Sequence, residues 1–474
     1  MRYRIKPVNI MLTMISLFAV LLTLWVYDGT AGNALLPLIP LSFFMMTLLA
    51  RRMLSRCVPD NFGVTVFIML LFIRSSLFPI CFALGGYSHV FRVPLADYMP
   101  QAILLSVYEI VMVFGVMILC DYGVKKKEQK QIKKEKKTTY NLHAMRFWVY
   151  GLLFVFAMTF VLVPECRYFY LNIFNITEMG FTNNEMSAVI DQYGTSFMSK
   201  LVLVLHNYLT KIIRFIVPLH LVFEIHKKNK RLSGYWMSMI ISAVNVFIID
   251  GTIARGLVYA FALMLLTCEI YDRKKKIYKI AILAVAAVVV YFAIRAIVVS
   301  RTQQNIWEYL SSYIGSYFSS VANTAANIRI KLTNRESFQY LSYDILSSIP
   351  FGNTLFGLEN ISYQKLFNDV NRSAGQIPTT IGTTYTYFGA VFAPIFSMIF
   401  AKLAYNSGLA VKHCESAFKK GIYLLLAIYS AMAVTMYYHK IVLVVIIGTL
   451  IPMILINKLV ERRKATKLHE NEEI

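Results

Sequence analysis

The chain has 474 residues, of which 57% are hydrophobic and only 15% are charged. An ordinary soluble domain carries about 25% charged residues, and the mean hydropathy of this chain is +0.57. Most of its length falls into apolar runs that are long enough, as helices, to cross a hydrocarbon core about 30 Å thick. This composition excludes a soluble enzyme and predicts an all-α polytopic membrane protein.

The net charge of +23 arises from 48 Lys and Arg against 25 Asp and Glu. The basic residues form short clusters after every second apolar run: Arg2, Arg4 and Lys6; Arg51, Arg52 and Arg56; Lys125–Lys137; Lys227–Arg231; Arg273–Lys276; Lys412, Lys419 and Lys420; and Arg462–Lys464. This alternation is the positive-inside pattern of membrane proteins. It predicts that both termini are cytoplasmic, and it accounts for the charge without a nucleic-acid partner.

The apolar runs predict about twelve transmembrane helices. The first run, which ends at Tyr27, is too long for a signal peptide and has no small-residue cleavage site, so we expect it to remain as a helix. In chain order the predicted helices lie at 8–27, 34–50, 62–83, 102–120, 147–163, 201–224, 235–250, 256–271, 279–299, 384–404, 421–437 and 441–457. The six cysteines are scattered without metal-type spacing, so we expect no disulfide framework and no metal site.

Three regions follow from these helices. Residues 1–299 hold the first nine, with an outer loop at 164–200 and a basic cytoplasmic loop at 121–146. Residues 300–383 form a large extracytoplasmic loop, and residues 384–474 hold the last three helices and a basic tail. The large loop carries a stripe with helical spacing, which predicts a folded loop with amphipathic helices: Ile306, Tyr309, Leu310, Tyr313 and Tyr317. Such a helix either lies in the membrane interface or lines a substrate groove.

Four cations fall within predicted membrane helices, namely Arg74, Lys211, Arg214 and Arg295, whereas Glu109 is the clearest acid there. Each buried Arg or Lys costs about 2.5–3.5 kcal/mol even on the lenient insertion scale, so an anion should compensate them. One interpretation is a cavity that binds an anionic substrate. The other is an Arg74–Glu109 ion pair, with Lys211 and Arg295 reaching toward the membrane surface.

The outer side of the predicted bundle carries further cations. The turn DGTIARG at 250–256 places Asp250 and Arg255 at the membrane surface, and Arg301 and Arg372 lie in the large loop. Guanidinium groups bind phosphate oxygens in a bidentate manner. These residues therefore suit a diphosphate held at the level of the lipid headgroups, although Arg301 and Arg372 also fit solvated loop positions.

The segment RSAGQIPTTIGTTYTYFGAVFAPIF, residues 372–396, resembles the place where the last large outer loop of Wzy-type oligosaccharide repeat-unit polymerases re-enters the membrane. The turn GTIARG at 251–256 is similar to a short segment that such proteins carry between two central helices. The resemblance implies a fold like that of the GT-C glycosyltransferases and an inverting glycosyl transfer without metal or cofactor. It also implies a place in the bacterial inner membrane, where repeat units linked to undecaprenyl diphosphate are joined into O-antigen or capsular polysaccharide on the outer face.

We assign roles to individual residues on this basis. The residues expected to contact the diphosphate in catalysis are Arg74, Arg214, Arg255 and Arg295. Lys211 and Arg301 are the next candidates for the diphosphate, and the substrate-binding residues also include Arg372, Tyr385 and Tyr387. The two tyrosines are expected to shape the acceptor site, although they also fit tyrosines of the membrane interface. The general base stays open among Glu109, Asp250, His206, Glu308 and Asp369, and His206 also fits a structural, hydrogen-bonded histidine.

Two other functions fit much of the same sequence. A flippase for the same lipid-linked units would also have about twelve helices and a cationic cavity, but a carrier gains little from a large folded loop. An O-antigen ligase would share the fold and the donor, and only the motif resemblance favours the polymerase. Membrane lipids and a chain-length regulator are the other candidate partners.

Overall fold

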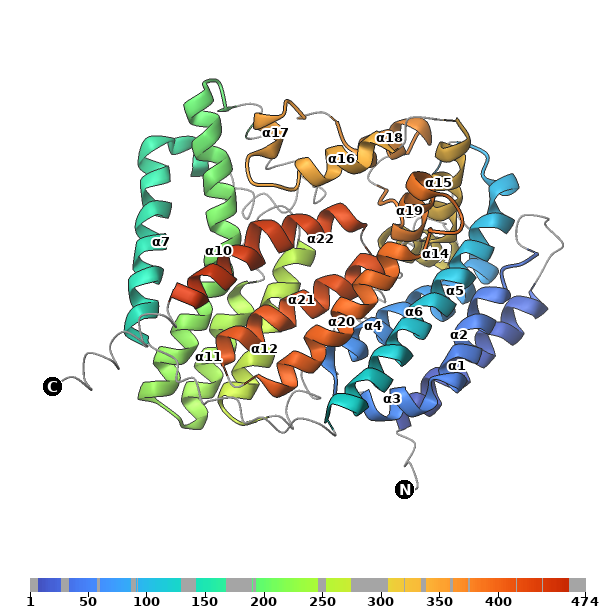
Figure 1. Cartoon of the computed structure of the whole chain (residues 1–474), viewed down its shortest axis with the longest axis horizontal. Helices are drawn as coiled ribbons and strands as arrows, with labels where there is room; N and C mark the ends of the chain where they lie inside the picture. The colour runs from blue at the N-terminus through green and yellow to red at the C-terminus, as the bar shows by residue number, and fades with distance from the viewer. Residues whose placement is uncertain are drawn as a thin grey trace.

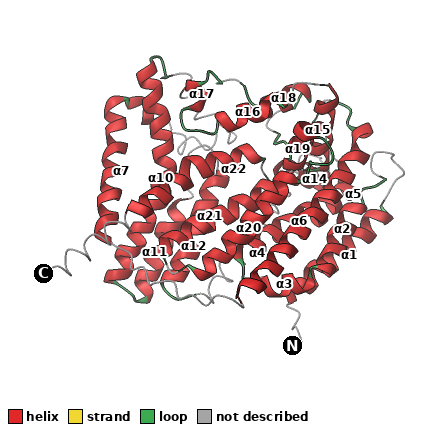
Figure 2. Ribbon diagram, in the orientation of Figure 1, coloured by secondary structure: helices red, strands yellow, loops and turns green. Residues whose placement is uncertain are grey.

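The computed structural model describes residues 7–26, 34–57, 60–86, 91, 93–128, 142–167, 190, 193–245, 253–273, 306–318, 320–333, 338–358, 361–373, 376–414, 416–436 and 438–459. Every regular element in these ranges is a helix, and they contain no strand (Figure 2). Within them, six helical runs are long and apolar enough to cross a membrane, and four shorter helices are also apolar. The chain is therefore an all-α protein with the character of a multi-pass membrane protein.

The N-terminal helices pack side by side at one end of the molecule (Figure 1). They are α1 (Pro7–Trp25), α2 (Leu38–Leu49), α3 (Arg51–Cys57), α4 (Phe62–Phe72), η2 (Ile73–Leu77), α5 (Phe78–Gly85), η3 (Ala96–Tyr98) and α6 (Met99–Glu128). The elements α4, η2 and α5 form one continuous run, interrupted by the π-helical turn η2. A π-turn disturbs the normal helical repeat and is frequent at functional sites; here it carries the buried Arg74.

Two long helices form an antiparallel pair at the other end of the molecule (Figure 1). This part of the chain comprises α7 (Leu142–Leu162), η4 (Pro164–Arg167), α10 (Phe197–Lys228), α11 (Leu232–Val244) and α12 (Ile253–Ile270). α10 begins with a capping box in which Ser196 and Ser199 each accept a hydrogen bond from the main-chain N–H of the other. The capping box satisfies two donors that the start of a helix would otherwise leave unpaired.

Five short helices, here called the loop helices, occupy the segment for which the sequence predicts a large folded loop. They are α14 (Ile306–Tyr317), α15 (Val321–Thr333), α16 (Gln339–Leu346), α17 (Gly352–Leu355) and α18 (Tyr363–Val370). α16, α17 and α18 follow one edge of the molecule, whereas α3 lies at the opposite edge (Figure 1). α14 packs on α5 so closely that a Cβ at Gly85 would come within 2.1 Å of the Trp307 main chain.

The C-terminal helices fill the centre of the molecule (Figure 1). They are α19 (Thr380–Phe388), α20 (Ile395–His413), α21 (Ala417–Thr435), α22 (His439–Val445) and the π-helical η7 (Ile446–Leu450). α21 packs against α20, α4 and α12, so it joins the N-terminal helices to the rest of the protein. The helical run that starts with α22 continues to Leu459 and is one of the six long enough to span a membrane.

The predicted helix 384–404 is wrong as a single element, because α19 ends at Phe388 and α20 begins at Ile395. Gly389, the C-cap of α19, lies between them with φ +83°, a backbone conformation that residues with a Cβ rarely adopt. The other predicted helices each overlap a described helix, except 279–299, which lies outside the described residues. Most of the predicted outer loop 164–200 and part of the basic loop 121–146 also lie outside them.

Candidate functional site

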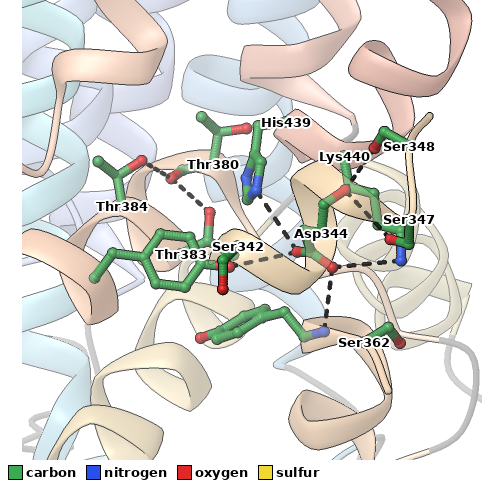
Figure 3. A network of polar contacts seen from close by, with 12 residues as sticks. Ser342, Asp344, Ser347, Ser348, Ser362, Thr380, Thr383, Thr384, His439 and Lys440 are labelled. Atoms are coloured by element: carbon green, nitrogen blue, oxygen red, sulfur yellow. Dashed lines mark hydrogen bonds and ion pairs between the residues drawn. The ribbon is translucent and has the colours of Figure 1, made fainter. Parts of the chain in front are cut away.

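Three ionisable side chains meet where α16 approaches the start of α22 (Figure 3). Asp344 belongs to α16 and is fully buried, and His439 and Lys440 are the first two residues of α22. Lys440 Nζ lies 3.4 Å from Asp344 Oδ1, and His439 Nε2 lies 3.6 Å from Asp344 Oδ2. We call these three residues the Asp344 cluster. It joins a loop helix to the start of a run that can span the membrane.

Two further groups donate hydrogen bonds to Asp344. The hydroxyl of Tyr387, in α19, donates to Oδ2 at 3.4 Å, and the main-chain N–H of Tyr363 donates to Oδ1 at 3.4 Å. Tyr363 is the first residue of α18, directly after its N-cap Ser362, so its N–H is one of those that a helix start leaves without a partner inside the helix. Each carboxylate oxygen therefore has one neighbour from α22 and one from another helix.

Aromatic rings surround the imidazole of His439. The ring centroids of Phe396 and Tyr438 lie 5.2 Å from it, and that of Tyr387 lies 5.7 Å from it. His439 is 2% exposed, and among the described residues neither of its ring nitrogens has a hydrogen-bond partner. A buried polar atom without a partner costs about 1–3 kcal/mol. The imidazole thus retains hydrogen-bonding capacity that its surroundings do not use.

The electrostatics of the cluster follow from burial. Burial raises the pKa of Asp344 above its ordinary value, and the ammonium of Lys440 opposes this change. Burial also raises the pKa of Tyr363, so its hydroxyl stays protonated and donates to Asn327 Oδ1 at 2.7 Å. That bond fastens α18 to α15 and thereby holds the Tyr363 N–H against Asp344.

The structure pairs Arg74 with Glu109, which is one of the two arrangements that the sequence left open. Arg74 Nη1 lies 2.8 Å from Glu109 Oε2 and also donates to the carbonyl of Val434 at 2.8 Å. The hydroxyl of Ser397 donates to Glu109 Oε1. Because Arg74 is 7% exposed and Glu109 is 1% exposed, the pair is a buried link between the π-turn η2, α6 and the end of α21.

Arg214 is buried with a different set of partners. Its Nε and Nη2 donate to the side-chain and main-chain oxygens of Asn245, both at 3.2 Å, and its guanidinium lies 5.3 Å from the centre of the Tyr259 ring. Lys211, one turn earlier in α10, lies over the ring of Tyr208 at 4.8 Å. These partners of Arg214 and Lys211 differ from those of Arg74, which are Glu109 and the carbonyl of Val434.

His206 is fully buried, and its contacts are those of a structural histidine. Its Nδ1 is hydrogen-bonded to the hydroxyl of Thr159 at 2.6 Å, and its ring stacks on Phe156 at 4.6 Å. This is the alternative that the sequence analysis gave for His206.

The two predicted acceptor tyrosines lie in different places. The hydroxyl of Tyr385 accepts a hydrogen bond from the amide of Gln101 at 3.0 Å. Tyr387, two residues later, contacts Asp344 and His439. Of all the residues proposed from sequence, Tyr387 alone among those described contacts the Asp344 cluster.

The remaining predicted residues are exposed or half-buried, or lie outside the described structure. Asp250, Arg295 and Arg301 and the side chain of Arg255 lie outside it. Arg372 is exposed and follows α18 with φ +48°, Asp369 is exposed on α18, and Glu308 is half-buried in α14.

Sequence reasoning did not select Asp344, His439 or Lys440. The predicted helices 421–437 and 441–457 leave His439 and Lys440 in a short turn between them, and Asp344 falls in the predicted loop 300–383, so all three are expected on the outer side of the membrane. That shared side was the available signal, because an acid, an imidazole and an ammonium in one aqueous compartment are candidates to meet. Their contact depends on how α16 packs on α22, which no local pattern reveals.

Comparison with known proteins gives no relative for the chain. No protein-family model, no curated protein and no solved structure matches it.

Proposed function

We propose that this protein is a membrane glycosyltransferase that polymerises oligosaccharide repeat units linked to undecaprenyl diphosphate, on the outer face of a bacterial cell membrane. The observation that carries the proposal is the Asp344 cluster, in which a buried carboxylate has an imidazole nitrogen 3.6 Å from one oxygen and an ammonium nitrogen 3.4 Å from the other. The sequence resemblance to Wzy-type polymerases supplies the substrate class.

The helices are compatible with twelve spans, and the sequence resemblance is what implies a fold of the GT-C kind. Six long runs and four shorter apolar helices, together with α20 and the apolar segment 279–299, make twelve. With α3 on the cytoplasmic side, α16, α17 and α18 at the opposite edge lie on the outer side (Figure 1). The cluster then lies at the level where the sugar and phosphate groups of a lipid-linked glycan meet the aqueous phase.

The chemistry that we propose uses His439 as the general base. Asp344 Oδ2, 3.6 Å from Nε2, favours the tautomer that carries the proton on Nε2, because the negative charge of the carboxylate stabilises a proton on the nearer ring nitrogen. Nδ1 then has the lone pair that takes the proton of the acceptor sugar hydroxyl. The hydroxyl oxygen bonds to the anomeric carbon of the donor, the bond from that carbon to the diphosphate oxygen breaks, and the lipid diphosphate leaves with the electron pair.

Cations stabilise the charge that develops on the leaving diphosphate. Arg214, Arg255 and Arg295 remain our candidates for this role, whereas the partners of Arg74 give it a structural role as well. Because His439 is 2% exposed, access of the substrate to Nδ1 requires one of the rings that pack on the imidazole, such as that of Phe396, to move aside while Asp344 stays in place.

The test is to incubate the purified protein in detergent with lipid-linked repeat units and to measure the size of the glycan. We expect a ladder of multiples with release of lipid diphosphate. Asp344→Asn should lose the ladder, whereas the matched control Asp97→Asn, which changes an exposed acid in η3, should keep it.

Other outcomes point to other functions. Unchanged substrate in detergent, but repeat units that cross the bilayer of liposomes containing the protein, would identify a flippase. Transfer of a preformed glycan to a lipid A core without a ladder would identify a ligase. Either result contradicts the proposed polymerase.

A further inference from the structure

The two oxygens of Asp344 have different environments. Oδ2 faces His439 and the hydroxyl of Tyr387, whereas Oδ1 faces Lys440 and the main-chain N–H of Tyr363. The oxygen that orients the imidazole is therefore not the one that contacts the cation. This division allows Lys440 to control the charge of Asp344 without a contact to His439.

The carboxylate needs such control because it is fully buried. A buried carboxylate without a cation takes up a proton rather than pay the cost of desolvation. The titratable groups that face Asp344 are His439 and Lys440 from α22, Tyr387 from α19, Tyr363 from α18, and Tyr438 just before α22. Among the residues that the structure describes, Lys440 is the permanent cation within 4 Å of Asp344.

We infer that Lys440 is a positioning residue, whose ammonium keeps Asp344 ionised so that the carboxylate can hold His439 as a base. The catalytic half of this inference rests on the proposed function, whereas the coupling of charge between Lys440 and Asp344 does not. The side chain of Lys440 is 18% exposed. It can therefore stay hydrated, and so charged, while it contacts a carboxylate that water does not reach.

A protonated Asp344 would lose this role. A neutral carboxyl group has its own proton to donate, so it no longer favours the tautomer of His439 with the proton on Nε2. Removal of the Lys440 charge therefore acts on the reaction through Asp344, and raising the pH should restore the carboxylate. A residue that only packs the site would show no such recovery.

The first test measures stability and needs no activity. The full-length protein in detergent is compared with Lys440→Met, Lys440→Arg, Asp344→Asn and the double variant Asp344→Asn/Lys440→Met by thermal unfolding between about pH 5 and about pH 8.

The sign follows from the raised pKa of Asp344. The folded state binds this proton more tightly than the unfolded state, so the contribution of Asp344 to stability falls as pH rises from the unfolded pKa through the folded one. Lys440→Met raises the pKa of Asp344 in the folded state further, so the decrease in its contribution to stability extends to higher pH. The loss of stability caused by Lys440→Met should therefore grow with pH when Asp344 is present. The same loss should be independent of pH when Lys440→Met is combined with Asp344→Asn. An equal loss at every pH in both backgrounds would overturn the inference.

The second test measures glycan polymerisation against pH. Lys440→Met should move the acidic limb of the profile upward by about 1–3 pH units, the usual effect of a neighbouring opposite charge, and Lys440→Arg should keep it near the native position. A uniform loss of rate at all pH values would contradict the positioning role. If the native protein makes no polymer, the proposed function fails, and the stability comparison still decides whether Lys440 sets the charge of Asp344.

Discussion

Arg74 Nη1 lies 2.8 Å from Glu109 Oε2 and donates, at the same distance, to the carbonyl of Val434 near the end of α21. The last carbonyls of a helix have no partner within it, and an arginine there also opposes the negative end of the helix dipole. The hydroxyl of Thr380 donates to the neighbouring carbonyl, that of Ala433. Arg74 and Thr380 thus supply hydrogen-bond donors to carbonyls at the end of α21 that the helix itself leaves without partners.

Removal of one partner of this ion pair should be costly. Arg74→Met leaves Glu109 buried without its cation, and the loss of one partner of a buried pair typically costs about 3–5 kcal/mol. We expect a clear fall in the thermal-unfolding midpoint in detergent, and a similar fall for Glu109→Gln. The double variant Arg74→Met/Glu109→Leu should recover most of the loss, because no unpaired charge remains. If the double variant falls by the sum of the two single losses, the pair is not the source of the effect.

Gly408 marks the closest approach of α20 to the start of α4. A Cβ at this position would come within 2.0 Å of Asn61 Oδ1, the atom that accepts the N-capping hydrogen bond from Val64. Gly408→Ala should therefore push Asn61 from its cap and lower the stability by about 1–3 kcal/mol, the usual cost of overpacking. Gly115→Ala in α6 is the control, because no atom lies within 4 Å of the added Cβ.

For the control we expect a gain of about 0.5–1 kcal/mol, because alanine is the better helix former. Both values can be measured from thermal-unfolding midpoints in the same detergent. If both alanines shift the midpoint alike, the close approach of α20 to α4 is not present in the protein.

The membrane helices could be predicted from sequence because the length of an apolar run is a local property. The runs at 62–83, 102–120 and 201–224 each lie within a continuous helical run of the described structure. The break at Gly389 could not be found in this way, since a single glycine in an apolar pattern is compatible with a continuous helix. Its positive φ depends on the packing of α19 and α20 in the folded protein.

The candidate site was predictable only in part. The apolar runs around Arg74 and Glu109 identified them as buried opposite charges, so their pairing could be named in advance as one of two arrangements. Tyr387 was selected from the motif at the end of the loop, and it does contact Asp344. Asp344 itself looks like any acid in a polar loop, and only the packing of α16 on α22 makes it a buried carboxylate.

Gly389 provides a test of the break between α19 and α20. Its φ of +83° is unfavourable for any residue with a Cβ, although no atom lies within 4 Å of an added one. Gly389→Ala should therefore lower stability by about 1–2 kcal/mol through the backbone alone. Gly151→Ala in α7, where an added Cβ also meets no atom, should cause no loss. A stabilising Gly389→Ala would indicate one continuous helix, as the sequence alone predicts.

His206 and His439, both of which are buried, should respond differently to the same substitution. His439→Gln removes the proposed base, so we expect polymerisation to fall by at least about 10²-fold at every pH, the usual contribution of a general base. His206→Gln keeps a group that can bond to the Thr159 hydroxyl, and we expect the reaction and its pH profile to survive with a lower unfolding midpoint. Glycan size analysis and thermal unfolding of the two variants in parallel measure both effects. Loss of the ladder in His206→Gln, with His439→Gln still active, would transfer the role of base to His206 and leave the Asp344 cluster as a structural link between α16 and α22.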